Sequence, residues 1–201
     1  MEYFFPEINY GRRGFEKFHT IYGGTTVFNS FRVIQRNKKP RVISTSEVKE
    51  EFLNRFTSKP ISMLGLSFET PAIMGILNVT PDSFYDGERF FTEKQFVEKG
   101  LRLLKIGCAV LDIGGESTRP GAKEVDLNKE WKRISKILKK LKNKKCLISL
   151  DTRKSKIMEK GIKSGAKIIN DVSGLEYDNN TINILKKYQV PFVIHHMKGK
   201  P

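Results

Sequence analysis

Residues 109–121 read AVLDIGGESTRPG, an apolar run that passes into acids, glycines, hydroxyl side chains and an arginine. The apolar start is typical of a buried parallel strand. A connection that only reverses the chain needs glycine and proline, but it does not need the charged and hydroxyl groups between them. The stretch therefore predicts a strand whose carboxyl end carries chemistry.

Four further short apolar runs end in polar or glycine-rich residues, and they lie at residues 73–79, 147–151, 167–171 and 192–196. Amphipathic segments separate the five runs, at residues 92–107, 131–141, 155–165 and 178–189. This alternation predicts a right-handed parallel α/β sheet. In an open sheet, ligands collect where a few strands meet, whereas in a barrel every strand end faces one mouth. The sequence therefore favours a (β/α)8 TIM-barrel type, incomplete here with about five strands.

Local signals predict where the helices begin, end and face the core. Thr92 and Gln95 form a capping-box pair, Asp178 is an acceptor at the start of the last segment, and Gly165 is a C-terminal stop. In the first of these helices, spacing places four apolar residues on one side: Phe96, Val97, Leu101 and Leu104. Residues 131–141 repeat this pattern, and both stripes are expected to be core.

Residues 1–70 have an irregular pattern with scattered aromatic side chains, apart from a predicted helix at 46–56 that begins at the cap Ser46. We treat residues 1–70 as an N-terminal extension of unknown role and residues 71–201 as the barrel domain. Cys108 and Cys146 lack metal-ligand spacing and fit a reducing compartment. The chain has neither a membrane-spanning stretch nor a signal-peptide pattern, so we expect a cytoplasmic protein with no membrane partner.

The formal net charge of +15 is compatible with nucleic-acid binding or with a lysine-rich solvated surface. Lysine predominates over arginine, and it is spread along polar helix faces with few aromatic residues between. Arginine is the residue that binds phosphates and bases in a two-pronged manner. The sequence therefore favours a solvated surface and predicts no nucleic-acid partner, with a basic interaction protein as the alternative.

Five motifs, IMGILNVTPDSF, LDIGGESTRPGA, ISLDT, GAKIINDVSG and HHMKGKP, occur in this order over about residues 71–201. They resemble the dihydropteroate synthase family of pterin-binding enzymes, and residues 1–70 resemble an extension of some bacterial members. The resemblance implies condensation of 4-aminobenzoate with 6-hydroxymethyl-7,8-dihydropterin diphosphate, in folate biosynthesis, with Mg2+ as cofactor. It also implies a homodimer at full length.

The stretch after the second strand suits a diphosphate leaving group, which must be held while it gains charge. Gly114 and Gly115 let the backbone approach, while hydroxyls and a guanidinium supply donors. The resemblance implies that Thr118 and Arg119 bind substrate, that Arg119 is also catalytic, and that Asn78 is the magnesium ligand. An oxygen donor suits Mg2+, which keeps most of its waters.

A pterin edge presents N–H groups and a carbonyl, so it needs a carboxylate acceptor and an amide that both donates and accepts. Asp151 and Asn170 are the expected pterin-binding residues, and Asp151 is expected to be catalytic because a carboxylate stabilises a cationic pterin methylene. A purely structural alternative for Asp151 is the cap of the following helix. The resemblance adds three substrate-binding residues: Met197 on the pterin face, and Pro81 and Phe84 at the aminobenzoate site.

Three features depart from the simplest interpretation. Tyr85 and Glu88 replace the small residues expected in the first motif, which puts the closure of that segment in doubt. His195 and His196 are adjacent on a strand and should point to opposite sides, so we expect one in the core and no zinc pair. A methyltetrahydrofolate-type methyltransferase barrel remains an alternative, although it would not need STRPG.

A complete barrel takes roughly 250 residues, whereas the chain has 201 residues and five predicted strands. We therefore expect an N-terminal fragment of a synthase that is inactive by itself.

Overall fold

The computed structural model describes residues 1–9, 18–59, 61–68, 70–80, 92–117 and 122–196. The chain forms two compact units, Met1–Pro71 and Ala72–Pro201, hereafter the N-terminal unit and the C-terminal unit. None of the helices in the described part of the chain has the length and apolarity needed to cross a membrane. Cys108 is buried, Cys146 is half-buried, and both are free thiols.

The N-terminal unit contains an antiparallel sheet and one helix: β1 (Glu2–Asn9), β2 (His19–Thr20), β3 (Val27–Gln35), β4 (Arg41–Ser44) and α1 (Glu50–Thr57). β3 is central, because β1, β2 and β4 all pair with it. Helix α1 covers one face, where the buried Phe31 ring packs against the rings of Phe52 and Phe56. The prediction that residues 1–70 are irregular was wrong, because these strands find their partners far along the sequence.

The predicted helix start at Ser46 was also wrong. Ser44 caps a single 3-10 turn, η2 (Thr45–Glu47), by accepting from the Ser46 amide, and Glu47 completes a capping box. Val48 and Lys49 then adopt extended backbone angles, so α1 begins only at Glu50. A serine cap was present in the sequence, but it starts a separate turn.

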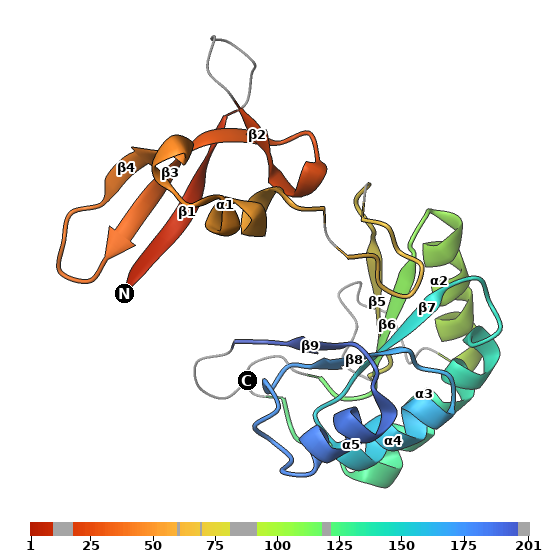
Figure 1. Cartoon of the computed structure of the whole chain (residues 1–201). Helices are drawn as coiled ribbons and strands as arrows, with labels where there is room; N and C mark the ends of the chain where they lie inside the picture. The colour runs from red at the N-terminus through yellow and green to blue at the C-terminus, as the bar shows by residue number, and fades with distance from the viewer. Residues whose placement is uncertain (10–17, 60, 69, 81–91, 118–121, 197–201) are drawn as a thin grey trace. The chain divides into compact units, whose positions relative to one another are not determined.

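The C-terminal unit alternates strands and helices: β5 (Met74–Asn78), α2 (Glu93–Lys105), β6 (Val110–Gly114), α3 (Leu127–Leu141), β7 (Leu147–Asp151), α4 (Ser155–Lys163), β8 (Ile168–Asp171), α5 (Thr181–Tyr188) and β9 (Phe192–Ile194). The five strands are parallel and lie in chain order. Figure 1 shows the four helices along one side of this sheet. The five predicted strands and the parallel, incomplete barrel are confirmed.

Alternation along the strands separates an apolar face from a polar one. Leu77, Ile113, Leu150 and Ile169 are buried in the core that the sheet shares with helices α2–α5. Successive strand residues point to opposite faces, so the residues next to these four point to the face without helices. Asn78, Asp151 and Asn170 all occupy such positions, which places them on what is the interior face of a barrel.

The helix signals were partly confirmed. The capping box of Thr92 and Gln95 forms at the start of α2, and Gly165 follows α4 with a φ of +111°. Leu101 was expected in the core, but it is 38% exposed, and the buried residue of that turn is Gly100. Asp178 does not cap α5, whose N-cap is Asn180; its carboxylate accepts from the Ser155 amide, at the start of α4.

Helix α4 approaches the sheet so closely that Gly161 has no room for a side chain. A Cβ atom there would lie 2.1 Å from Cδ2 of Leu150, a buried residue of β7. We expect Gly161→Ala to lower the free energy of unfolding by about 1–3 kcal/mol. Leu150→Val removes the clashing atom, so urea denaturation of the double variant should give a loss smaller than the sum of the two single losses. Additive losses would contradict this close contact.

Candidate functional site

A row of residues crosses the carboxyl end of the parallel sheet. Asn78 of β5 pairs with Gly114 of β6, Gly114 pairs with Asp151 of β7, and Asp151 pairs with Asn170 of β8. Partners in a parallel ladder point to the same face of the sheet, so this row brings three of the predicted site residues together on the interior face. A Cβ atom at Gly114 would lie 3.0 Å from Oδ2 of Asp151. Glycine at this position therefore leaves room for the Asp151 carboxylate.

Asn170 links two further residues across the sheet. Its Nδ2 donates to Oδ2 of Asp112 over 3.0 Å, and its Oδ1 lies 2.7 Å from Nε2 of His195. Because an amide oxygen only accepts, this contact requires the proton of His195 to be on Nε2. Asp112 is buried in β6, and its Oδ1 has no hydrogen-bond partner among the described residues.

The sequence interpretation missed Asp112 as a site residue. The available signal was an acid inside an otherwise apolar strand, two residues before Gly114 and therefore on the same face. The expectation that either His195 or His196 is in the core was wrong, since both are exposed in the described chain. The adjacent strand β9 is exposed as well.

The carboxyl group of Asp151 has an unusual electrostatic environment. Burial raises its pKa from the ordinary value of 3.8 to about 7, and the negative charges of four other acids add to the shift: Asp112, Glu130, Asp171 and Glu116. The structural alternative of a helix cap does not apply, because the N-cap of α4 is Lys154. Asp151 is therefore a half-buried acid that exchanges its proton near neutral pH.

This shift predicts a pH dependence of stability. The pKa of Asp151 is higher in the folded state, so the folded protein binds more protons than the unfolded chain between pH 3.8 and about 7. The contribution of Asp151 to stability is therefore present at low pH and falls as the pH rises to about 7. Asp151→Asn should gain stability relative to the parent over this range, as measured by urea denaturation at several pH values. A stability difference that stays constant with pH would contradict the raised pKa.

A buried ion-pair cluster lies next to this row. Nζ of Lys154 donates to Oε2 of Glu116 over 2.6 Å and to Oε2 of Glu130 over 2.7 Å, and all three side chains are buried. Thr152 donates to the second oxygen of Glu130, and Arg153 donates to the second oxygen of Glu116. Burial alone would raise the pKa of Glu116, but the hydrogen bonds from Arg153 and Lys154 outweigh it, and the pKa of Glu116 is lowered.

Five of the predicted site residues lie outside the described residues: Pro81, Phe84, Thr118, Arg119 and Met197. The same holds for Tyr85 and Glu88. The roles of all these residues stay predictions. The site that the structure describes therefore consists of Asn78, Asp112, Asp151 and Asn170, with His195 bound to the last of them.

The described residues also bear on the predicted magnesium site. They contain no group of three or more His, Cys, Asp or Glu side chains that could hold a metal ion. Asn78 is a half-buried oxygen donor at the strand end. Mg2+ commonly keeps several waters and binds through one or two protein ligands together with substrate phosphates. The described residues therefore fit a magnesium ion that arrives with a diphosphate, and they do not fit an all-protein site.

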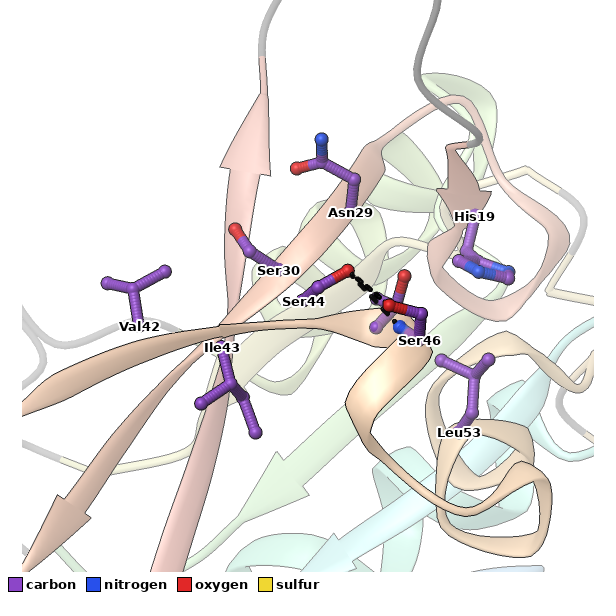
Figure 2. A pocket seen from close by; sticks show the side chains of 9 residues that line it. His19, Asn29, Ser30, Val42, Ile43, Ser44, Ser46 and Leu53 are labelled. Carbon is purple, nitrogen blue, oxygen red and sulfur yellow. Dashed lines mark hydrogen bonds between the residues drawn. The ribbon is translucent and has the colours of Figure 1, made fainter.

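A pocket lies within the N-terminal unit, and it has a volume of about 710 Å3. Figure 2 shows hydroxyl and amide side chains at its wall, among them Ser30, Ser44, Ser46 and Asn29. Among the described residues that line it, His19 is the one with an ionisable side chain. This pocket lacks the charged groups that a diphosphate requires, so the row in the C-terminal unit is the candidate site.

Comparison with known proteins shows the family to which the C-terminal unit is similar. The family model described as pterin binding enzyme matches residues 74–201. The dihydropteroate synthase of Haemophilus influenzae is 38% identical over 137 residues, which are 68% of this chain and 50% of that protein.

Solved structures give the same result. The Xanthomonas albilineans dihydropteroate synthase with 4-aminobenzoic acid aligns with a TM-score of 0.62 and 41% identity, over 67% of this chain and 49% of that one. The Burkholderia cenocepacia dihydropteroate synthase complexed with 7,8-dihydropteroate aligns with a TM-score of 0.59 and 34% identity, over 68% of this chain and 45% of that one.

The chain thus spans about half the length of these bacterial relatives. The matched region begins at the first residue of β5 and includes the entire row of Asn78, Asp151 and Asn170. The fold, the site row and the family model therefore lead to one conclusion: this chain belongs to the pterin binding enzyme family.

Proposed function

We propose that the chain carries the pterin-binding half of a dihydropteroate synthase, which joins 4-aminobenzoate to 6-hydroxymethyl-7,8-dihydropterin diphosphate and releases diphosphate. The observation that carries the proposal is the row of Asn78, Asp151 and Asn170, with Asp112 on the same face. The bound 4-aminobenzoic acid and 7,8-dihydropteroate of the related structures support both substrates.

Hydrogen-bonding groups on the interior face suit the edge of a pterin ring. The Asp151 carboxylate accepts from ring and exocyclic N–H groups when it is ionised. Asn170 uses one N–H for Asp112 and one lone pair for His195, which leaves its second N–H and its second lone pair for a ligand. Asp151 and Asn170 together can therefore form hydrogen bonds with both the N–H donors and the carbonyl acceptor of a pterin.

The reaction separates charge, and the proposed residues stabilise the charges that develop. The bond from the pterin methylene carbon to the diphosphate oxygen breaks, and its electron pair leaves with the oxygen. The amine nitrogen of 4-aminobenzoate bonds to the same carbon and loses a proton. Ionised Asp151 stabilises positive charge on the pterin, while Thr118 and Arg119 are proposed to hold the departing diphosphate.

Asn78 is the proposed protein ligand of Mg2+, since it is an oxygen donor at the end of β5. A bound magnesium ion would neutralise charge on the diphosphate. Asn78 would also orient the diphosphate at the carboxyl edge of the sheet. The homodimer, the cytoplasmic location and the lack of a nucleic-acid partner stay predictions.

A binding comparison separates this function from a basic nucleic-acid-binding protein. We expect the full-length protein to be stabilised against heat by the pterin diphosphate, and to bind random DNA no more tightly than a lysine-rich control protein of equal charge. Tight, salt-dependent DNA binding without any shift from the pterin diphosphate would contradict the proposal.

A further inference from the structure

Glu116 joins the two ends of the connection between β6 and α3. The residue lies two positions after Gly114, the last residue of β6, and its Oε1 accepts from the amide of Val125, 3.2 Å away and nine positions later. Val125 directly precedes Asp126, the N-cap of α3. The buried carboxylate of Glu116 thus links the start of this connection to its end by a hydrogen bond. The segment between them contains Thr118 and Arg119, to which the sequence assigns diphosphate binding.

Lys154 holds Glu116 in this position. Its ammonium group bridges Glu116 and Glu130, and the exposed fractions of the three side chains are 5%, 6% and 0%. Burial alone would lower the pKa of Lys154, but its hydrogen bonds to Glu116 and Glu130 outweigh this effect, and the pKa of Lys154 is raised. The lysine is therefore charged at neutral pH, and its loss would leave Glu116 with Arg153 but would remove the ion pair of the buried Glu130. Such an uncompensated charge inside a protein is strongly unfavourable.

Other contacts hold the same two chain segments. Arg133 of α3 donates to the carbonyl oxygen of Gly115 over 2.6 Å, and a Cβ atom at Gly115 would lie 2.9 Å from the side chain of Ile134. Arg153 stacks on the ring of Tyr177, with its guanidinium carbon 4.1 Å from the ring centroid. Tyr177 in turn donates to Glu124, the neighbour of Val125. The connection is therefore fixed at both ends to the segments that follow β7 and β8.

We propose that Lys154 is a positioning residue: through Glu116 and Glu130 it fixes the two described ends of the β6–α3 connection, at Glu116 and at Val125, and diphosphate binding depends on this arrangement. The ammonium group is buried and donates to two carboxylates, so we infer that it acts through Glu116 and not by touching substrate. The proposal rests on the proposed function, because the diphosphate is the ligand that the connection is expected to hold.

The first test measures, without any ligand, whether Lys154 keeps the Glu116 carboxylate hydrogen-bonded to the Val125 amide. Lys154→Met keeps most of the side-chain volume and removes the charge. We expect it to speed hydrogen exchange of the Val125 amide roughly tenfold, because the acceptor Glu116 loses its lysine. Lys163→Met is the matched control, since Lys163 is an exposed lysine of α4 that pairs with Glu159. Unchanged exchange at Val125 in Lys154→Met would overturn the proposal.

The second test compares two probes, inorganic pyrophosphate and 6-hydroxymethyl-7,8-dihydropterin, by calorimetry on the full-length protein. Lys154→Met should bind pyrophosphate roughly tenfold more weakly, which corresponds to one charge-assisted hydrogen bond out of place. Its affinity for the pterin should remain within about twofold of the parent. Lys154→Arg should recover part of the pyrophosphate affinity. Equal losses for both probes would mean that Lys154 supports only the overall fold, and the proposal would fall.

A double variant separates positioning from stability. Lys154→Met combined with Glu130→Gln restores the charge balance of the cluster but still leaves Glu116 without its lysine. We expect it to recover thermal stability and not pyrophosphate affinity, and it replaces the single variant if Lys154→Met fails to fold. Full recovery of pyrophosphate affinity would show that only charge balance matters, and would overturn the proposal.

Failure of the proposed function would give a different pattern. The parent protein would then bind neither pyrophosphate nor the pterin, which removes the ligand role assigned to Lys154. Hydrogen exchange of the Val125 amide would still show whether Lys154 holds Glu116 against Val125.

Discussion

Asp151→Asn is expected to weaken binding of 6-hydroxymethyl-7,8-dihydropterin by roughly 10- to 100-fold, and to leave the affinity for inorganic pyrophosphate unchanged. A hydrogen bond to a charged group contributes about 1.5–3 kcal/mol, and this substitution replaces an ionised acceptor by a neutral amide of the same shape. Calorimetry at pH 8 is the measurement, because the carboxyl group, with a pKa of about 7, is then mostly ionised. Below pH 7 the difference between parent and variant should shrink.

The matched control is Asp126→Asn. Asp126 caps α3 by accepting from the amides of Asn128 and Lys129, and asparagine caps helices about as well as aspartate. This variant should bind both probes like the parent. If Asp151→Asn lost pterin and pyrophosphate affinity in the same proportion, Asp151 would be a structural residue and not a pterin acceptor.

Arg119→Ala is expected to weaken binding of inorganic pyrophosphate by roughly 10- to 100-fold while the pterin still binds. A guanidinium forms two parallel hydrogen bonds to a phosphate, and alanine offers none. Arg119→Lys should recover only part of the affinity, since a point charge replaces a two-pronged donor. Arg102→Ala, at an exposed position near the end of α2, is the matched control. Pyrophosphate affinity equal to the parent would remove Arg119 from the site.

The row of Asn78, Asp151 and Asn170 was accessible from the sequence. Each residue ends a short apolar run, and the carboxyl ends of parallel strands meet at one edge of a sheet. Alternation along each strand then decides which face a residue occupies, and counting from the apolar neighbours Leu77, Leu150 and Ile169 gives the same face for all three.

Contacts between distant segments were not accessible in this way. Asn170 and Asp112 are 58 positions apart, and Lys154 lies 38 positions from Glu116. Which side chains meet at such separations depends on strand register and on helix placement, and no local pattern encodes either. The raised pKa of Asp151 has the same origin, because it combines burial with acids from strands β6 and β8, from the segment after β6 and from the start of α3.

Local signals also failed to locate helix starts where several neighbouring residues could each act as a cap. Ser46 and Asp178 are both good capping residues, and both lie close to a helix start. Ser44 caps the preceding turn instead, and Asp178 binds the first amide of α4, whereas α5 begins after Asn180. Tertiary packing chose among several local acceptors, which sequence spacing alone does not resolve.

The most direct test of the proposed function is release of diphosphate from 6-hydroxymethyl-7,8-dihydropterin diphosphate by the full-length protein, with and without 4-aminobenzoate. The structure and the family predict release that depends on 4-aminobenzoate, with one 7,8-dihydropteroate formed for each diphosphate, and a severe loss of turnover in Asp151→Asn. Tight binding of the pterin diphosphate without any 4-aminobenzoate-dependent release, in a folded full-length protein supplied with Mg2+, would contradict it.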